Sequence, residues 1–219
     1  MRSTIALVAI SLTLVGCKDP GAQVTAAEVE ASAPEADTPS GNKDSANALA
    51  INPSNSKVEF VGAKVTASHP GGFTDFSGKV ELGDPIEQSR VQITIQTASL
   101  YADKEKLTKH LQSPDFFDVA KFPTATFEST EIKKEGERHT ISGKLTLHGV
   151  TKHIRFPATI SASDPEVSEN AVFSINRQDF GKNYPGLKDD LIRDLVVIKL
   201  SLRLPKGLGG ATRGVGVGG

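Results

Sequence analysis

The stretch from Ile51 to Pro205 alternates apolar and polar residues in short runs, separated by clusters of Gly, Pro, Asp, Asn and Ser. A period of two places successive side chains on opposite faces of a β-strand. The runs predict eight strands, near residues 57–62, 76–82, 91–96, 125–128, 141–147, 154–160, 173–175 and 196–204. An even number of antiparallel strands with one apolar face favours closure into a barrel, because closure removes exposed sheet edges. We therefore expect an all-β fold, built as an eight-stranded antiparallel barrel.

One segment between the third and fourth predicted strands departs from this period. Asp103 is expected to cap a helix that carries Leu107 and Leu111 on one face. A second start signal, Ser-Pro at residues 113–114, leads into two adjacent phenylalanines at residues 116–117. One or two short helices are therefore predicted here. The adjacent phenylalanines suit either a plug over an apolar opening or ordinary packing in the core.

The N-terminus has the parts of an export signal. Arg2 supplies a positive charge, residues 5–12 form an apolar run, and the sequence Leu-Val-Gly-Cys ends at Cys17. This ending resembles the bacterial lipobox, which implies cleavage before Cys17 and acylation of that residue. An ordinary secretory signal with an accidental cysteine is the alternative. We expect a lipoprotein signal peptide over residues 1–16 and a lipid anchor on the periplasmic side of the cell envelope, with Lys18 slightly favouring the outer membrane.

Two further segments lack an apolar face. Residues 18–49 contain no aromatic residue and more acidic than basic ones, and half of residues 206–219 are glycine. Such segments cannot bury enough apolar surface to offset the entropy lost on ordering. We expect a lipidated cysteine and disordered linker over residues 17–49, a folded barrel domain over residues 50–205, and a mobile Gly-rich tail over residues 206–219.

Charge and cysteine content exclude several classes of protein. The 219 residues include 25 basic and 26 acidic side chains, a formal net charge of −1, so no nucleic-acid partner is expected. The single cysteine excludes an internal disulfide framework and a cysteine-rich metal site. His148 and His153, an odd number of residues apart, would lie on opposite faces of one strand or on different strands. We therefore expect no metal and no cofactor.

The sequence also lacks the local patterns of common catalytic sites. No nucleophile elbow, phosphate-binding loop or dinucleotide fingerprint occurs, so no enzymatic activity is expected. Asp115 and Asp118 suit helix caps better than a pair of catalytic acids. Arg177 and Arg193 lie among carboxylates in loops around Tyr184. They suit either a buried ion pair or, because the guanidinium is permanently charged and forked, contact with an anionic head group.

Four blocks of sequence resemble the YceI-like family of polyisoprenoid-binding or lipid-binding periplasmic proteins. The blocks are residues 57–80, 106–130, 141–156 and 175–181, and the second, with a His-Leu pair before SPDFFD and FPTATF, is long enough to be specific. The resemblance covers nearly all of the predicted barrel. It implies a lipocalin-like eight-stranded barrel that holds a long isoprenoid or fatty-acid-type chain in its lumen. Departures from the family pattern near the expected mouth, at residues 107–108 and in the SHPGG segment, leave the head group open.

The resemblance and the strand alternation together define an expected ligand site. Its apolar lumen residues, including the two helical phenylalanines, are Phe60, Phe76, Val91, Ile93, Ile95, Phe116, Phe117, Phe127, Leu145, Leu147, Phe173 and Ile175. Its polar rim residues are His69, His110, Arg177, Tyr184 and Arg193. Each lumen residue also suits ordinary core packing, because eight strands enclose either a filled core or one slender ligand.

The expected function is non-catalytic binding, storage or transport of a long-chain amphiphile by an envelope lipoprotein. The expected partners are an isoprenoid or fatty-acid-type lipid and the membrane that holds acylated Cys17, with a homodimer left open. The alternative is an envelope stress or interaction lipoprotein whose barrel is packed solid and whose partner is a protein. An enzyme acting on a lipid is disfavoured rather than excluded, because catalytic groups converge in space and not in sequence.

Overall fold

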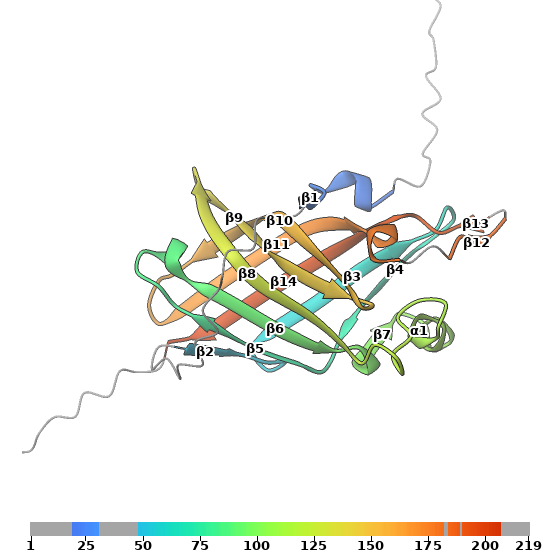
Figure 1. Ribbon diagram of the computed structural model, residues 1–219, viewed down its shortest axis with the longest axis horizontal. Coiled ribbons are helices and arrows are strands. Elements are labelled where there is room, and N and C mark those ends of the chain that lie inside the picture. The colour runs from blue at the N-terminus through green and yellow to red at the C-terminus, as the bar shows by residue number, and fades with distance from the viewer. Residues whose placement is uncertain (1–18, 31–47, 182–183, 189, 207–219) are drawn as a thin grey trace, which may run out of the picture.

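The computed structural model describes residues 19–30, 48–181, 184–188 and 190–206 (Figure 1). The predicted signal peptide, Cys17 and all but the first residue of the predicted tail lie outside these ranges. Within them, no helix has the length and apolar character needed to cross a membrane.

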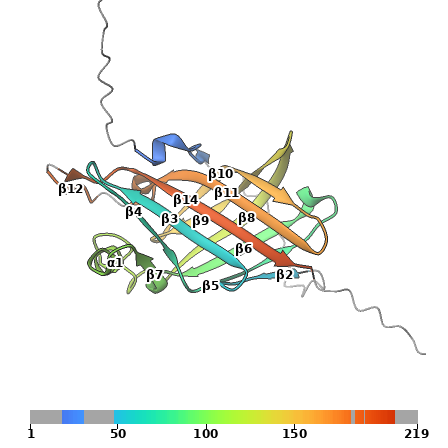
Figure 2. The same cartoon turned by 180° about the vertical axis from the view of Figure 1, so that it is seen from behind.

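Most of the described chain is antiparallel β-sheet (Figures 1 and 2). The strands that match the predicted runs are β3 (Ser56–Ala63), β5 (Phe76–Glu81), β6 (Arg90–Gln96), β8 (Thr124–Glu135), β9 (Arg138–Leu147), β10 (Val150–Ser161), β11 (Glu166–Asn176) and β14 (Leu195–Pro205). The remaining strands are β1 (Glu28–Glu30), β2 (Ala48–Ile51), β4 (Ser68–Phe73), β7 (Leu100–Ala102), β12 (Gly186–Leu187) and β13 (Asp190–Leu191). All the strands predicted from the alternation are present, which confirms the all-β class.

The strands curl into a barrel. Twelve of them form one sheet in the order β2-β5-β6-β8-β9-β10-β11-β14-β3-β4-β7, with β1 added to β10. Strand β5 lies next to one end of this order, and β4 lies next to the other end. Only Thr74 and Asp75 separate β4 from β5 in the chain, so the bend between them holds the two ends of the sheet together. The fold is therefore the predicted antiparallel barrel, with more strands than the eight expected.

Strands β9 and β10 form a hairpin that turns at His148 and Gly149. Leu147 pairs with Val150, and the two residues between them have positive φ angles, 52° at His148 and 74° at Gly149. Two left-handed residues form the type I′ turn that matches the twist of antiparallel strands. A Cβ at Gly149 would also lie 2.6 Å from the ring of Phe122. Both the positive φ angle and the close approach of this ring therefore favour glycine at this position.

Strand β4 was not predicted, because its sequence favours a break. β4 contains Pro70, Gly71 and Gly72 and pairs with β3 on one side and β7 on the other. A Cβ at Gly71 would lie 2.4 Å from the ring of Phe60 and 2.4 Å from the carbonyl oxygen of Tyr101. The glycines here therefore allow close packing of the neighbouring strands rather than ending the sheet.

One α-helix lies between the third and fourth predicted strands, as expected, and the rest of that segment differs from the prediction. Helix α1 spans Glu105–Gln112, and its N-cap residue is Lys104, which makes no side-chain cap. The prediction of a cap at Asp103 is wrong, because the Asp103 carboxylate lies 3.0 Å from His69 Nδ1 instead. Residues 113–117 form hydrogen-bonded turns, with the Phe116 N–H donating to the Ser113 carbonyl at 3.0 Å, rather than a second helix. Four short 3-10 helices complete the described elements, η1 (Gly21–Gln23), η2 (Ile86–Gln88), η3 (Thr97–Ser99) and η4 (Arg177–Phe180).

The predicted linker contains a segment that packs on the barrel. Strands β10 and β11 pair directly over Thr159–Ser161 and Ser168–Asn170, and beyond this short ladder residues 25–30 lie between them. On one side β1 pairs with β10, and on the other the Ala27 N–H donates to the Ser174 carbonyl of β11 at 2.7 Å. The expectation of disorder is therefore wrong for residues 19–30, because the edges of two distant strands supply the hydrogen bonds that the segment cannot form alone.

The end of the barrel away from α1 is filled by side chains. The residual space there is about 20 Å³ and is lined by Val80, Val91, Leu202 and other apolar residues around the side chain of Glu169 on β11. Burial without a compensating charge raises the pKa of the Glu169 carboxyl to about 7. This group therefore couples stability of the barrel to pH.

Replacing Glu169 by glutamine should flatten the dependence of stability on pH. Because the folded state has the higher pKa, it retains a proton that the unfolded state releases, and stability of the parent protein falls as pH rises from about 4.5 to about 7. Glu169→Gln removes this loss, which is worth about 3 kcal/mol above pH 7. Urea unfolding of both proteins at pH 5 and pH 8 measures the effect, and an unchanged difference between the two pH values in the variant would contradict it.

Candidate ligand-binding cavity

A cavity of about 810 Å³ occupies the barrel from its middle to the end that carries α1. Most of its lining side chains are apolar and come from opposite walls, for example Val58, Ile93 and Phe173. The volume lies within the range of about 300–1,000 Å³ that is usual for small-molecule sites. The barrel is therefore hollow at this end, and the alternative of a lumen packed solid along its whole length is wrong.

Strand register places the lining side chains in rows across neighbouring strands. On one wall, Ile93 of β6 pairs with Phe127 of β8, and Phe127 pairs with Leu145 of β9. On the opposite wall, Phe173 of β11 pairs with Ile198 of β14, which pairs with Phe60 of β3. Residues that pair across an antiparallel sheet project from the same face. Each row therefore presents one band of apolar side chains to the cavity.

The predicted lumen residues divide between the hollow end and the filled end. The lining residues among them are Phe60, Ile93, Ile95, Phe116, Phe117, Phe127, Leu145, Leu147, Phe173 and Ile175. Phe76 and Val91 do not line the cavity: Phe76 is 3% exposed in the packed core, and Val91 lines the small space beside Glu169. Alternation shows which side chains point inward but carries no signal for the depth at which each one lies.

Helix α1 and the turn that follows it cover part of the mouth. Leu107 and Leu111, on one helical face as predicted, both line the cavity together with the two phenylalanines of residues 116–117. The His110 ring lies 5.0 Å from the Phe116 ring and 5.3 Å from the Tyr184 ring, measured between centroids. This aromatic cluster joins α1 to the loop before β12. Phe116 is 8% exposed, so it is both a lining residue and a packed one.

All five predicted rim residues line the mouth, and most of them are held by carboxylates or carbonyl groups. His69 Nδ1 lies 3.0 Å from Asp103, and His110 Nε2 lies 3.0 Å from Asp115. Arg177 Nη2 lies 2.9 Å from Asp194, and its Nε donates to the Arg193 carbonyl at 3.1 Å. Arg177, itself buried, thus forms an ion pair at the cavity wall, whereas the Asp194 side chain is 46% exposed, so the predicted buried ion pair is buried on the arginine side alone.

Sequence reasoning missed several lining residues that lie at strand ends and turns. Lys64 follows β3, Lys104 precedes α1, and His148 occupies the β9–β10 turn. The ammonium group of Lys64 donates a hydrogen bond to Asp190 and holds the pKa of that carboxyl below its usual value. These positions depend on which loops meet at the mouth, and the alternation of apolar and polar residues carries no signal for that.

The histidines near the cavity do not gather into a metal site. His148 lines the cavity, whereas His153 on β10 lies 2.7 Å from Glu30 through its Nδ1 and 2.9 Å from Thr130 Oγ1 through its Nε2. Within the described ranges no group of three or more His, Cys, Asp or Glu side chains is placed to hold a metal ion.

Comparisons with known proteins agree on one family. Residues 49–204 match the YceI-like domain. A UPF0312 protein of Pseudomonas putida (strain W619) is 41% identical over 125 residues, which is 53% of this chain and 65% of the relative's own length. The crystal structure of BcnA from Burkholderia cenocepacia superimposes with a TM-score of 0.62 at 27% identity, covering 68% of this chain and 95% of BcnA. A polyisoprenoid binding domain from Saccharophagus degradans, implicated in plant cell wall breakdown, shares the fold with a TM-score of 0.59 at 18% identity over 73% of this chain and 98% of the domain.

Two glycines on paired strands test the packing of the cavity wall. Gly71→Ala should destabilise the barrel by about 1–3 kcal/mol, because the new methyl group collides with the Phe60 ring and the Tyr101 carbonyl. Gly62→Ala on β3 is the matched control, since nothing lies within 4 Å of a Cβ there, and it should leave stability unchanged or raise it slightly. Denaturant midpoints measure both, and equal midpoints for the two variants would contradict the described packing.

Proposed function

The chain belongs to the YceI-like family, and on that premise we propose that it binds a long-chain apolar lipid, of the isoprenoid or fatty-acid type, inside its barrel. The observation that carries this proposal is the cavity of about 810 Å³, with its largely apolar walls, in a barrel whose other end is filled. The structural neighbour described as a polyisoprenoid binding domain supports a ligand of this type for the fold.

The shape of the lumen suits a slender chain. Phe127, Phe156 and Phe173 line the deep part of the cavity as one aromatic group, with ring centroids 5.6 Å apart between the first two and 4.2 Å apart between the last two. Each CH₂ group that leaves water for such surroundings contributes about 0.8 kcal/mol. A long chain would therefore bind tightly without a precise polar contact, and the filled end below would limit how far it enters.

The lining chemistry supports binding rather than catalysis. No serine, threonine or cysteine is present among the described residues that line the cavity. The histidines at its mouth face carboxylates across the exposed rim, at His69–Asp103 and His110–Asp115, rather than a side chain that they could activate as a nucleophile. A carrier or store requires only that the ligand be held away from water.

Mass spectrometry of organic extracts from the native protein tests the proposal directly. A stoichiometric long-chain species is the expected result. A stable protein that is consistently empty, or one that converts an added lipid into a product, would contradict the proposed function.

A bulky side chain in the cavity should exclude the ligand without unfolding the barrel. Leu145→Trp places the added ring in open space, so the variant should lose the long-chain ligand while the delipidated protein keeps its melting temperature within a few degrees. Ile132→Trp is the matched control, because Ile132 is 4% exposed at the filled end and overpacking there should cost about 1–3 kcal/mol. Both measurements use delipidated protein, since bound ligand stabilises the native state. Retention of full ligand by Leu145→Trp, or its strong destabilisation, would show that the lumen is not open at this position.

We further propose that the protein is anchored through acylated Cys17 on the periplasmic side of the bacterial envelope. The support is the lipobox-like Leu-Val-Gly-Cys sequence that ends at the only cysteine of the chain. Fatty-acid labelling in cells should mark the parent protein, and Cys17→Ala should abolish the label. A parent protein whose intact mass carries no acyl chains would refute the anchor.

A further inference from the structure

The described chain begins beside the mouth of the cavity. Asp19 Oδ2 lies 3.8 Å from Arg193 Nε, and Arg193 lines the mouth. The first turn of η1 fixes this carboxylate, because the Gly21 N–H donates to Asp19 Oδ1 at 2.9 Å. The residues that follow continue onto the wall of the barrel between β10 and β11. The N-terminal segment is therefore fastened to the mouth end and along the adjoining wall.

This attachment limits where Cys17 can lie. Only Lys18 separates it from Asp19, and consecutive Cα atoms are about 3.8 Å apart, so the Cα atoms of Cys17 and Asp19 lie within about 8 Å of each other. An acyl anchor on Cys17 would hold the mouth of the cavity at the membrane, rather than at the end of a linker of more than thirty residues.

The mouth end also displays apolar side chains at its loop tips. Val65, in the β3–β4 turn, is 41% exposed, and Leu191, in β13, is 49% exposed. The two tips are joined, because the Val65 N–H donates to the Leu191 carbonyl at 3.0 Å. Asp190 fixes the same junction by accepting a hydrogen bond from Thr66 Oγ1 at 2.9 Å. Two exposed apolar side chains are thus held together on one firm projection.

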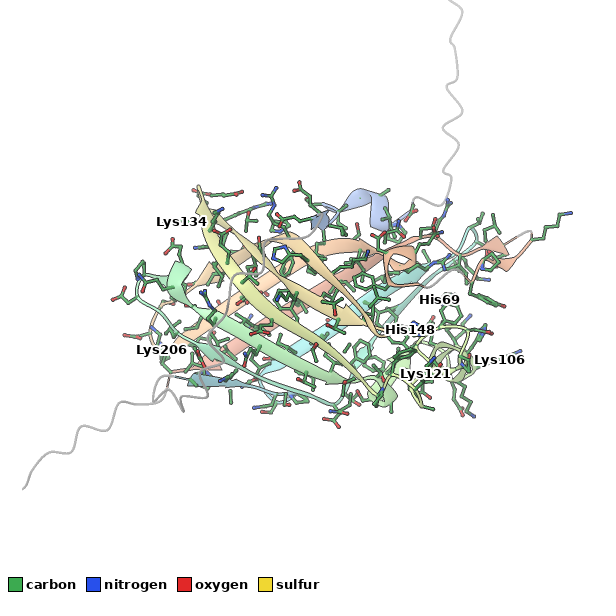
Figure 3. The ribbon with its side chains drawn as sticks, viewed as in Figure 1. His69, Lys106, Lys121, Lys134, His148 and Lys206 are labelled. Carbon is green, nitrogen blue, oxygen red and sulfur yellow. The ribbon has the colours of Figure 1, made fainter. Side chains whose placement is uncertain are left out.

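Three lysines lie at the same end of the barrel. Lys104 and Lys106 lie at the start of α1 and line the mouth, and Lys188 is exposed in the turn between β12 and β13. None of the three forms an ion pair with a residue that the structure describes. Figure 3 shows Lys106 with His69 at this end, while Lys134 and Lys206 lie at the opposite end. Lysines at the same end as a small apolar tip match a surface of anionic phosphate head groups above acyl chains.

We propose that the mouth end of the barrel docks on the surface of an anionic lipid bilayer, with Val65 and Leu191 entering the interface. The docked surface consists of the β3–β4 turn, Lys188 and β13, and the start of α1. The proposal rests on the proposed function, since it takes Cys17 as acylated and the cavity as a lipid site. In this orientation a long chain passes between bilayer and cavity without crossing open water.

The test uses the full chain, purified from membranes and placed in vesicles of phosphatidylglycerol and phosphatidylcholine. Because acylation blocks Cys17, a cysteine introduced by Val65→Cys at the mouth or by Lys134→Cys at the opposite end is the only reactive thiol for a fluorescent label. A quencher attached to the lipid should quench the label at residue 65 several-fold more than the label at residue 134. Equal quenching at the two ends would overturn the proposal, and so would preferential quenching that appears in native membranes but not in pure-lipid vesicles, since that result indicates a protein partner.

A second pair of variants tests the apolar contact itself. Leu191→Ser, in the protein labelled at residue 65, should lower the ratio of docked to undocked protein by about a factor of ten, because a buried leucine side chain is worth at least that factor. Val172→Ser is the matched control, since Val172 is 47% exposed on the outer face of β11, and it should leave the ratio unchanged. An equal effect of both variants would overturn the proposal. A protein without acyl chains or bound lipid would instead refute the proposed function, so the two failures are distinguishable.

Discussion

The curling of one sheet into a barrel, with its two ends held together by the bend between β4 and β5, is the constraint on which the rest of this structure depends. Once the strands form a barrel, every second side chain points into one lumen, and the volume of those side chains decides what the lumen can hold. At one end, Ile141, Leu202 and their neighbours fill it. At the other, the strands run on to loops and to α1, and a cavity of about 810 Å³ remains between the same kinds of side chain. One alternating pattern therefore builds a packed core and a ligand site in a single continuous interior.

The N-terminal segment, residues 25–30, completes the barrel wall where β10 and β11 do not pair directly with each other. Beyond their short direct ladder, β10 and β11 offer unpaired backbone groups, and residues 25–30 bond to both strands. Ala27 packs against the core, and Glu28 forms an ion pair with Arg155 on β10. Edges left open in a sheet invite pairing with other chains, so this segment closes a gap in the barrel as well as fastening the chain to it.

The periodicity of the sequence predicted the positions of the main strands. The close packing of glycines, the depth of each side chain along the barrel and the docking of the N-terminal segment depend on the three-dimensional arrangement. The strands around Val91, Leu145 and Leu200 were predictable because apolar and polar residues alternate along the sequence of each one. Gly71 misled the prediction because a glycine that permits close packing looks in sequence like a glycine that breaks a strand. Phe76 and Phe60 carry the same signal, yet one lies in the filled core and the other at the cavity, since depth along the barrel depends on strand tilt and register. The docking of residues 19–30 was not predictable, because it depends on edges supplied by strands far along the chain.

The charges at the mouth bear on how a ligand would be selected. Arg177 is held by Asp194, His69 by Asp103, and Lys64 by Asp190, so an anionic head group that sought these side chains would have to displace a carboxylate already in place. The gain from such an exchange is small, because one charge-assisted contact replaces another. The apolar walls offer no comparable competition: each further CH₂ group of a bound chain adds about 0.8 kcal/mol until the lumen is filled. Selection by this barrel would therefore act on the length and width of the chain more than on its head group, and the floor formed by the aromatic side chains would set the limit.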